Sequence, residues 1–117
     1  MLEKLRKLLP EIDYQKALTI CNGDEEFYLE IFKDFTELPI KADLVKCMAD
    51  GDYKNYCIHI HGFKNNAYSI GANAIGDLAY EMEKLTREEI TDEIPLMQAT
   101  LFEQYDRICN QFNNINN

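Results

Sequence analysis

The sequence predicts an all-α protein that folds as an antiparallel up-down four-helix bundle with short additional helices at its N-terminus. Several stretches place apolar residues every three or four positions, which is the period of a helix with one buried face. No stretch alternates apolar and polar residues as a half-buried strand does. Proline, glycine and asparagine fall between the periodic stretches and divide them into helices of bundle length.

Length and composition indicate one domain over residues 1–117. A globular chain of this size removes about two-thirds of its unfolded surface from water, and 46% hydrophobic residues are enough for one core. The 21 acidic and 12 basic residues give a net charge of −9. This charge opposes binding to nucleic acid or to an anionic membrane surface, so neither is expected as a partner.

The cysteines and the apolar runs predict a cytoplasmic setting. No charged-then-apolar signal segment opens the chain, and the cysteines form no C-x-x-C pair, which favours reduced thiols. The longest apolar runs are far shorter than the ~18 residues that a membrane-spanning helix needs. The four cysteines are Cys21, Cys47, Cys57 and Cys109.

Two short helices are expected before the bundle. Leucines recur at helical spacing in residues 1–11 until Pro10 stops the pattern, which predicts an amphipathic helix that covers one end of the bundle. Asp13 is suited to cap a second helix that runs through Cys21. The following Asn22-Gly23 pair supplies the left-handed residue that ends it.

A longer helix should follow, with acidic residues 24–26 at its positive N-terminal end. Pro39 lies inside the helical pattern, where it removes a backbone hydrogen bond and clashes with the previous turn, so we expect a kink or a brief break. The apolar positions that mark the pattern are Phe27, Ile31, Phe35 and Leu38 before the break, and Ala42, Val45, Met48 and Ala49 after it.

The next helix is predicted to begin after Gly51 and the capping Asp52, and to end near Gly71. Its buried stripe comprises Tyr56, Ile60, Phe63 and Ala67. The Cβ of His61 lies roughly 130° from the centre of this stripe, so the pattern that buries the stripe directs His61 towards water. Lys64 and Asn65, one turn on, share its side of the helix.

Two further helices complete the expected bundle. The small residues Ala72 and Gly76 permit close approach of a neighbouring backbone. Pro95 is tolerable only in the first turn of the last helix, and residues 113–117, rich in asparagine, should fray. The inward positions are Ile75, Leu78, Ala79, Met82 and Leu85 in the first helix, and Ile94, Leu101, Tyr105, Ile108 and Phe112 in the second.

The pattern His61-x-Phe63-Lys64, with Gly71 ten residues after the histidine, resembles the signature of histidine-containing phosphotransfer (HPt) domains of two-component phosphorelays. That signature reads His-x-Leu-Lys-Gly, and Asn65 stands where the family often has the glycine. The resemblance extends over residues 12–83 and includes the segments Ile12-Asp13-Tyr14, Gly23–Leu29, Ala49–Asp52 and Met82-Glu83.

The resemblance implies a phosphocarrier that accepts a phosphoryl group on His61 from the aspartyl phosphate of a receiver domain or hybrid histidine kinase, and passes it to another response regulator. An imidazole in a free peptide has a pKa of about 6.5, so a neutral ring nitrogen is available at pH 7. Lys64 would offset the charge of the phosphoryl oxygens, and Asn65 would donate a hydrogen bond to them. Cys57, Tyr68 and Gly71 complete the expected interface.

The chain has no phosphate-binding loop of the G-x-x-x-x-G-K-[ST] type and no kinase signature, so the resemblance implies a passive relay and no enzyme. No cofactor is expected, and Mg²⁺ would belong to the partner receiver domain. The expected state is a monomer. Both a free-standing cytoplasmic protein and the cytoplasmic part of a larger membrane-bound hybrid kinase fit the sequence.

Two other readings remain open. A helical docking module that binds receiver domains without accepting phosphate would share these features. A metal site is disfavoured because His59 is rotated about 200° from His61, and neither histidine follows a glutamate by three residues as in di-iron bundles. We expect His59 to lie at the edge of the apolar stripe and to hydrogen-bond locally.

Overall fold

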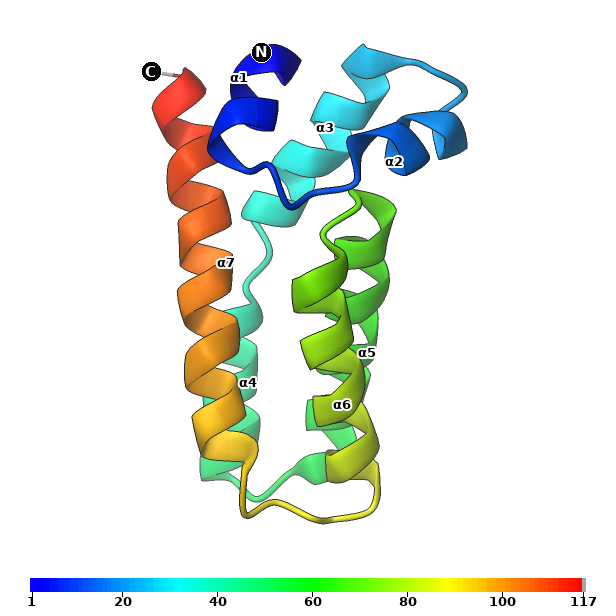
Figure 1. Cartoon of the computed structure of the whole chain (residues 1–117). Coiled ribbons are helices and arrows are strands. Elements are labelled where there is room, and N and C mark those ends of the chain that lie inside the picture. The colour runs from blue at the N-terminus through cyan, green and yellow to red at the C-terminus, as the bar shows by residue number, and fades with distance from the viewer. Residues whose placement is uncertain (117) are drawn as a thin grey trace.

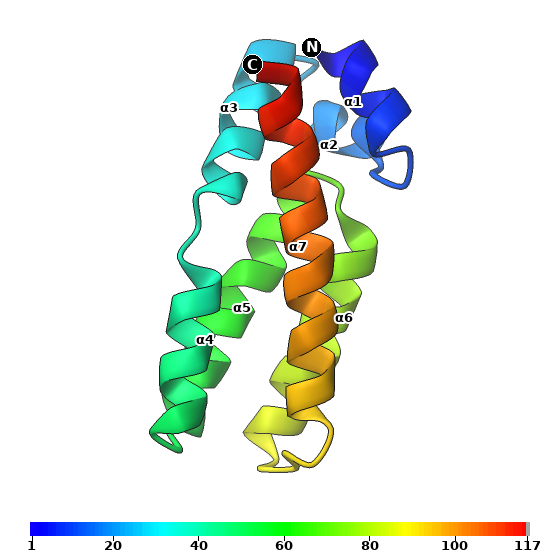
Figure 2. The same ribbon diagram turned by 90° about the vertical axis from the view of Figure 1, so that its left-hand side faces the viewer.

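The computed structural model describes residues 1–116, in which every regular element is a helix. The last four helices form an antiparallel up-down bundle, and the first three cover one end of it beside the C-terminal half of the long last helix (Figures 1 and 2). The predicted fold class is therefore confirmed. The helices are α1 (Leu2–Leu8), α2 (Tyr14–Ile20), α3 (Glu25–Thr36), α4 (Ile40–Ala49), α5 (Tyr53–Ser69), α6 (Asn73–Arg87) and α7 (Ile94–Asn116).

Side-chain caps and left-handed turns set the predicted helix boundaries. The carboxylates of Asp13, Asp24 and Asp52 each accept a hydrogen bond from the backbone N–H three residues on, at 3.0 to 3.1 Å. Asn22-Gly23 has positive φ angles of 56° and 77°, and Gly51 has a φ of 66°. These residues end α2 and α4 by adopting the conformation that glycine and asparagine tolerate best.

The break at Pro39 is confirmed, because α3 ends at Thr36 and α4 begins at Ile40. The inward faces of both helices differ from the prediction. Phe27 is 49% exposed and Val45 is 52% exposed. Both helices carry apolar residues on neighbouring faces, and the packed face comprises Tyr28, Phe32, Phe35, Ile40, Leu44 and Cys47.

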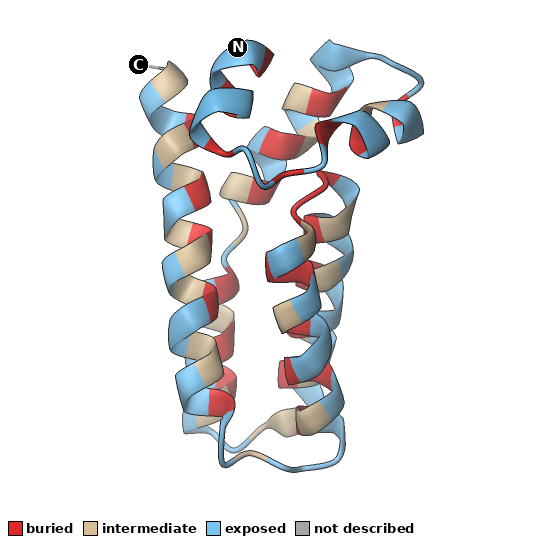
Figure 3. Cartoon of the chain, in the orientation of Figure 1, coloured by how far each residue is buried: buried red, intermediate tan, exposed pale blue. Residues whose placement is uncertain are grey.

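The core runs along the bundle axis (Figure 3), and the predicted stripe of α5 is completely buried. The ring of Phe63 on α5 lies 5.2 Å from that of Phe35 and 5.5 Å from that of Tyr105, measured between centroids. Tyr105 also donates a hydrogen bond of 2.6 Å to the carbonyl of Phe35. This aromatic cluster ties α3, α5 and α7 together.

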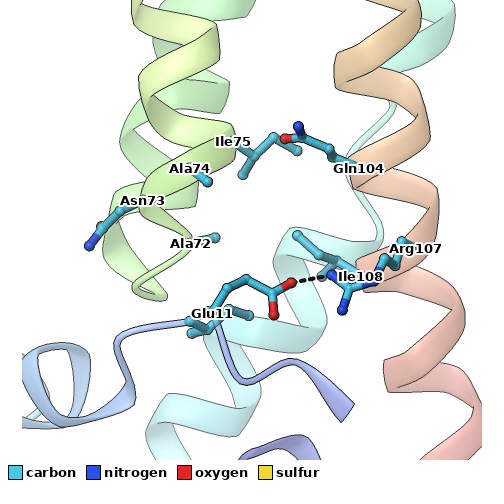
Figure 4. A pocket seen from close by; sticks show the side chains of 9 residues that line it. Glu11, Ala72, Asn73, Ala74, Ile75, Gln104, Arg107 and Ile108 are labelled. Carbon is cyan, nitrogen blue, oxygen red and sulfur yellow. Dashed lines mark hydrogen bonds and ion pairs between the residues drawn. The ribbon is translucent and has the colours of Figure 1, made fainter.

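The turn between α5 and α6 joins the bundle to the N-terminal helices. Gly71 has a φ of 82°, and its carbonyl accepts a 2.9 Å hydrogen bond from the backbone N–H of Asp13. Beside this junction lies a small cavity of about 210 Å³, across which Arg107 of α7 donates to Glu11 (Figure 4). Gly71 therefore fixes how the N-terminal segment is attached to the bundle.

The C-terminal end differs from the prediction. Fraying was expected from Asn113, yet α7 remains helical to Asn116; Asn117 lies outside the described residues. None of the helices in the described part of the chain is both long and apolar enough to cross a lipid bilayer.

Candidate functional site

The imidazole of His61 lies on the outer side of α5, where the helical pattern predicted it. Its side chain is 54% exposed, although Ile60 and Phe63 beside it in the sequence are buried. The predicted exposure of His61 is confirmed. A rigid, packed helix thus presents a histidine ring to solvent.

A buried carboxylate on the neighbouring helix contacts this ring. Glu83 belongs to α6, and its side chain is only 5% exposed. Its Oε2 lies 2.8 Å from Nδ1 of His61 and accepts a 2.6 Å hydrogen bond from Arg87. Its Oε1 accepts a 2.7 Å hydrogen bond from Nζ of Lys64. Glu83 therefore joins the histidine and two cations in one network.

The ionisation of Glu83 decides the tautomer of His61. Burial acts to raise the pKa of Glu83, but the hydrogen bonds and charges of Lys64 and His61 outweigh burial and hold this pKa below its ordinary value. An ionised carboxylate only accepts hydrogen bonds, so Nδ1 of His61 carries the hydrogen that it shares with Oε2. In the neutral ring, Nε2 then bears the free lone pair and faces away from Glu83.

Lys64 and Asn65 contact opposite nitrogens of the ring. Nζ of Lys64 lies 3.4 Å from Nδ1 of His61, which is longer than its 2.7 Å bond to Glu83, so the carboxylate is its main partner. Lys64 also lies 5.4 Å from the ring centroid of Tyr80. The Nδ2 of Asn65 lies 3.3 Å from Nε2 of His61, which agrees with Nε2 as the acceptor. The sequence-predicted trio is thus brought together in space.

The other predicted interface residues occupy less exposed positions. Tyr68 donates a 2.7 Å hydrogen bond to Asp77, and its ring fills the space beside Gly76, so it joins α5 to α6. Cys57 is half-buried, and burial raises the pKa of its thiol. Gly71 is buried against the backbone of Asp13. Backbone packing accounts for this glycine, and its place in an interface stays a prediction.

His59 lies on the other side of α5, at the edge of the apolar stripe as predicted. Its Nδ1 is 3.6 Å from Oδ2 of Asp43 on α4, which is an ion-pair distance when the ring is protonated but too long for a hydrogen bond. The two histidines therefore face different neighbours. Within residues 1–116 no group of three His, Cys, Asp or Glu side chains is placed to hold a metal ion.

The roles of Glu83 and Arg87 were not predicted from the sequence. Glu83 follows Ala79 by one helical turn and precedes the buried Thr86 by three residues, so it extends the apolar stripe of α6. A carboxylate at a buried position needs a cationic partner. An acidic residue within an apolar stripe is therefore a sign of such a pair, and the sequence contains this sign. Arg87 follows Glu83 by four residues, and side chains at this spacing lie next to each other on a helix.

Comparisons of the chain with protein-family models, with curated proteins and with solved structures found no match. The functional argument therefore depends on the motif around His61 and on the geometry just described. That geometry comprises an exposed imidazole, an Nδ1 bonded to Glu83, an Nε2 beside the amide of Asn65 and two nearby cations.

Removing the charge of Glu83 should make the free energy of unfolding vary less with pH in the acidic range. Since its folded pKa is lowered, ionised Glu83 stabilises the native state above its unfolded pKa of about 4.3, and this stabilisation is lost as the pH falls through the folded pKa. We expect Glu83→Gln to lower the free energy of unfolding by about 2 kcal/mol at pH 7, because Lys64 loses its partner. Below pH 4 the difference should shrink.

Urea unfolding of both proteins at pH 7 and pH 3 measures this difference. Glu81→Gln is the matched control, since Glu81 is exposed on the same helix, and it should change the unfolding free energy by less than about 0.5 kcal/mol. A difference between wild type and Glu83→Gln that stays constant with pH would contradict the assignment of Glu83 as an ionised partner.

Proposed function

We propose that this chain is an HPt-type phosphocarrier, and that Nε2 of His61 accepts a phosphoryl group from the aspartyl phosphate of a receiver domain. One observation carries the proposal: the buried carboxylate of Glu83 engages Nδ1 of His61 and leaves Nε2 on the exposed side of the ring. This is the arrangement that a nucleophilic imidazole requires, because the base at one nitrogen sets the tautomer that frees the other.

The transfer balances without any other reactant. The Nε2 lone pair attacks phosphorus, the P–O bond to the partner's aspartate breaks, and the electron pair of that bond leaves on the aspartate carboxylate. Nδ1 keeps its hydrogen, and Glu83 stabilises the positive charge that develops on the ring. The return step reverses these bonds, with the aspartate of a second receiver as the nucleophile.

The surroundings of His61 suit a phosphoryl group electrostatically. Lys64 and Arg87 together exceed the single negative charge of Glu83, so the network is net positive although the whole chain carries −9. Asn65 lies at Nε2, where its amide is placed to donate to an oxygen of the attached phosphoryl group. In this role the chain needs no nucleotide, and Mg²⁺ comes with the partner receiver domain.

A panel of isolated receiver domains tests the proposal. Each is phosphorylated with a small-molecule phosphodonor in the presence of Mg²⁺ and then mixed with this chain. We expect at least one receiver to lose its label to the chain within minutes, in a form that acid removes and alkali does not. If some receivers bind and none transfers its label, the chain is instead a docking module that accepts no phosphate.

A further inference from the structure

Tyr80 lies beside the network around Glu83 and has no part in the bond changes of the proposed transfer. It belongs to α6 and precedes Glu83 by three residues, so the two side chains are neighbours on one face of that helix. The centroid of its ring lies 5.4 Å from Nζ of Lys64, which is within the range of a cation–π contact. Because Tyr80 is 51% exposed, it can be replaced without opening the core.

The side chain of Lys64 is unusually well buried for a lysine, with only 13% of it exposed. Taking an ammonium group out of water is costly unless other groups replace its hydration. In this structure Oε1 of Glu83, at 2.7 Å, and the ring face of Tyr80 are the replacements. A cation–π contact strengthens when the cation is desolvated. The ring of Tyr80 is therefore a second group, besides the carboxylate, that holds this ammonium in place.

The position of Lys64 determines how the carboxylate of Glu83 is shared. Oε2 of Glu83 lies 2.8 Å from Nδ1 of His61 and also accepts a 2.6 Å hydrogen bond from Arg87. A guanidinium binds both oxygens of a carboxylate when both are free. Because Lys64 occupies Oε1, Arg87 is confined to Oε2, and the carboxylate stays turned towards the imidazole. If Lys64 left Oε1, Arg87 would compete with Nδ1 of His61 for the carboxylate.

We propose that Tyr80 is a positioning residue for the phosphoacceptor. Its ring holds Lys64 on Oε1 of Glu83, and this keeps Oε2 of the same carboxylate on the imidazole. The inference rests on the proposed function, since it assigns Tyr80 to the control of the nitrogen that accepts the phosphoryl group. The face of the ring makes the contact with Lys64, so phenylalanine should replace tyrosine here and an aliphatic side chain should not.

The ¹⁵N-labelled full chain, without any receiver, tests this assignment by NMR. At a pH at which the imidazole is neutral, its ¹⁵N shifts give the ratio of the tautomer with hydrogen on Nδ1 to the tautomer with hydrogen on Nε2. We expect the Nδ1–H tautomer of His61 to dominate in the wild type. Tyr80→Leu should lower the ratio about threefold, and Tyr80→Phe should keep the wild-type ratio.

Two further variants show whether Tyr80 acts through Lys64. Lys64→Met already lacks the ammonium, so adding Tyr80→Leu to it should not change the tautomer ratio any further. Tyr53→Leu is the matched control, because Tyr53 is a half-buried tyrosine in the first turn of α5, about two turns before His61. This control should keep the wild-type ratio.

Phosphoryl transfer is measured separately. With a receiver that labels the wild type, the initial rate should fall about twofold in Tyr80→Leu, because a displaced Glu83 stabilises the positive ring less, and should not fall in Tyr80→Phe. If no receiver labels the chain, the proposed function fails, while the tautomer ratios still decide the role of Tyr80. A wild-type ratio in Tyr80→Leu, an equal change in Tyr80→Phe, or an added change in the Lys64→Met background would overturn the proposal.

Discussion

Replacing His61 with glutamine is expected to abolish phosphoryl acceptance, with a loss of at least about 1,000-fold in the initial rate of labelling. Glutamine preserves much of the size and polarity of the side chain, but its amide has no nucleophilic lone pair. Because His61 is more than half exposed and glutamine can keep a hydrogen bond to Glu83, the variant should keep the helical content of the wild type and an unfolding midpoint close to it. Transfer from a phosphorylated receiver, followed by gel autoradiography, measures the loss.

His59→Gln is the matched control, because it changes a histidine two residues away on the other side of the same helix. We expect it to be labelled within about twofold of the wild-type rate. Full labelling of His61→Gln would refute the phosphoacceptor assignment, and loss of labelling in both variants would point to a general effect on α5.

Replacing Gly71 with alanine is expected to cause the largest loss of stability of any single methyl addition at a glycine of this chain. An added Cβ would overlap the carbonyl oxygen of Asp13, and the φ of 82° is unfavourable for alanine. Strain and displacement of the N-terminal segment together should lower the free energy of unfolding by about 3 kcal/mol, or the Tm by about 12 °C. Thermal and urea unfolding monitored by circular dichroism measure both.

Substitutions at two other glycines separate the effect of backbone strain from that of the contact with Asp13. Gly51→Ala has a φ of 66° but an open site, so it should lose only about 1 kcal/mol from backbone strain. Gly62→Ala lies inside α5 with nothing within 4 Å, and alanine's higher helix propensity should stabilise the protein by about 0.5 kcal/mol. A loss at Gly71 no greater than that at Gly51 would show that the contact with Asp13 is unimportant.

The fold could be predicted from the sequence because local signals agree with one another. In α5 the buried residues Tyr56, Ile60, Phe63 and Ala67 repeat at helical spacing, and Asp52 and Gly51 fix where that helix begins. The inward faces of α3 and α4 were predicted less well. Phe27 and Tyr28 are adjacent apolar residues, so spacing alone does not decide which is buried; Tyr28 is, and its hydroxyl reaches the carbonyl of Ile70 at 2.7 Å.

The site was predicted in part for a similar reason. His61, Lys64 and Asn65 lie within two turns of one helix, and helical geometry alone brings them together. Glu83 belongs to another helix, and only the packing of α6 on α5 shows that its carboxylate meets Nδ1 of His61. Lys64 was expected to face the phosphoryl group, yet in this structure its amine is bonded to Glu83. Contacts between helices depend on register, which no single-helix pattern contains.

Identifying the nitrogen that becomes phosphorylated is the most direct test of the proposal that Nε2 of His61 accepts the phosphoryl group. The ¹⁵N-labelled protein, phosphorylated by a receiver and examined by ¹⁵N–³¹P correlation NMR at alkaline pH, should show one phosphohistidine, at Nε2 of His61, with Nδ1 still bonded to hydrogen. Mass spectrometry of the same sample assigns the residue. Phosphate on Nδ1, on His59 or on a carboxylate would contradict the role given to Glu83 and to the exposed face of His61.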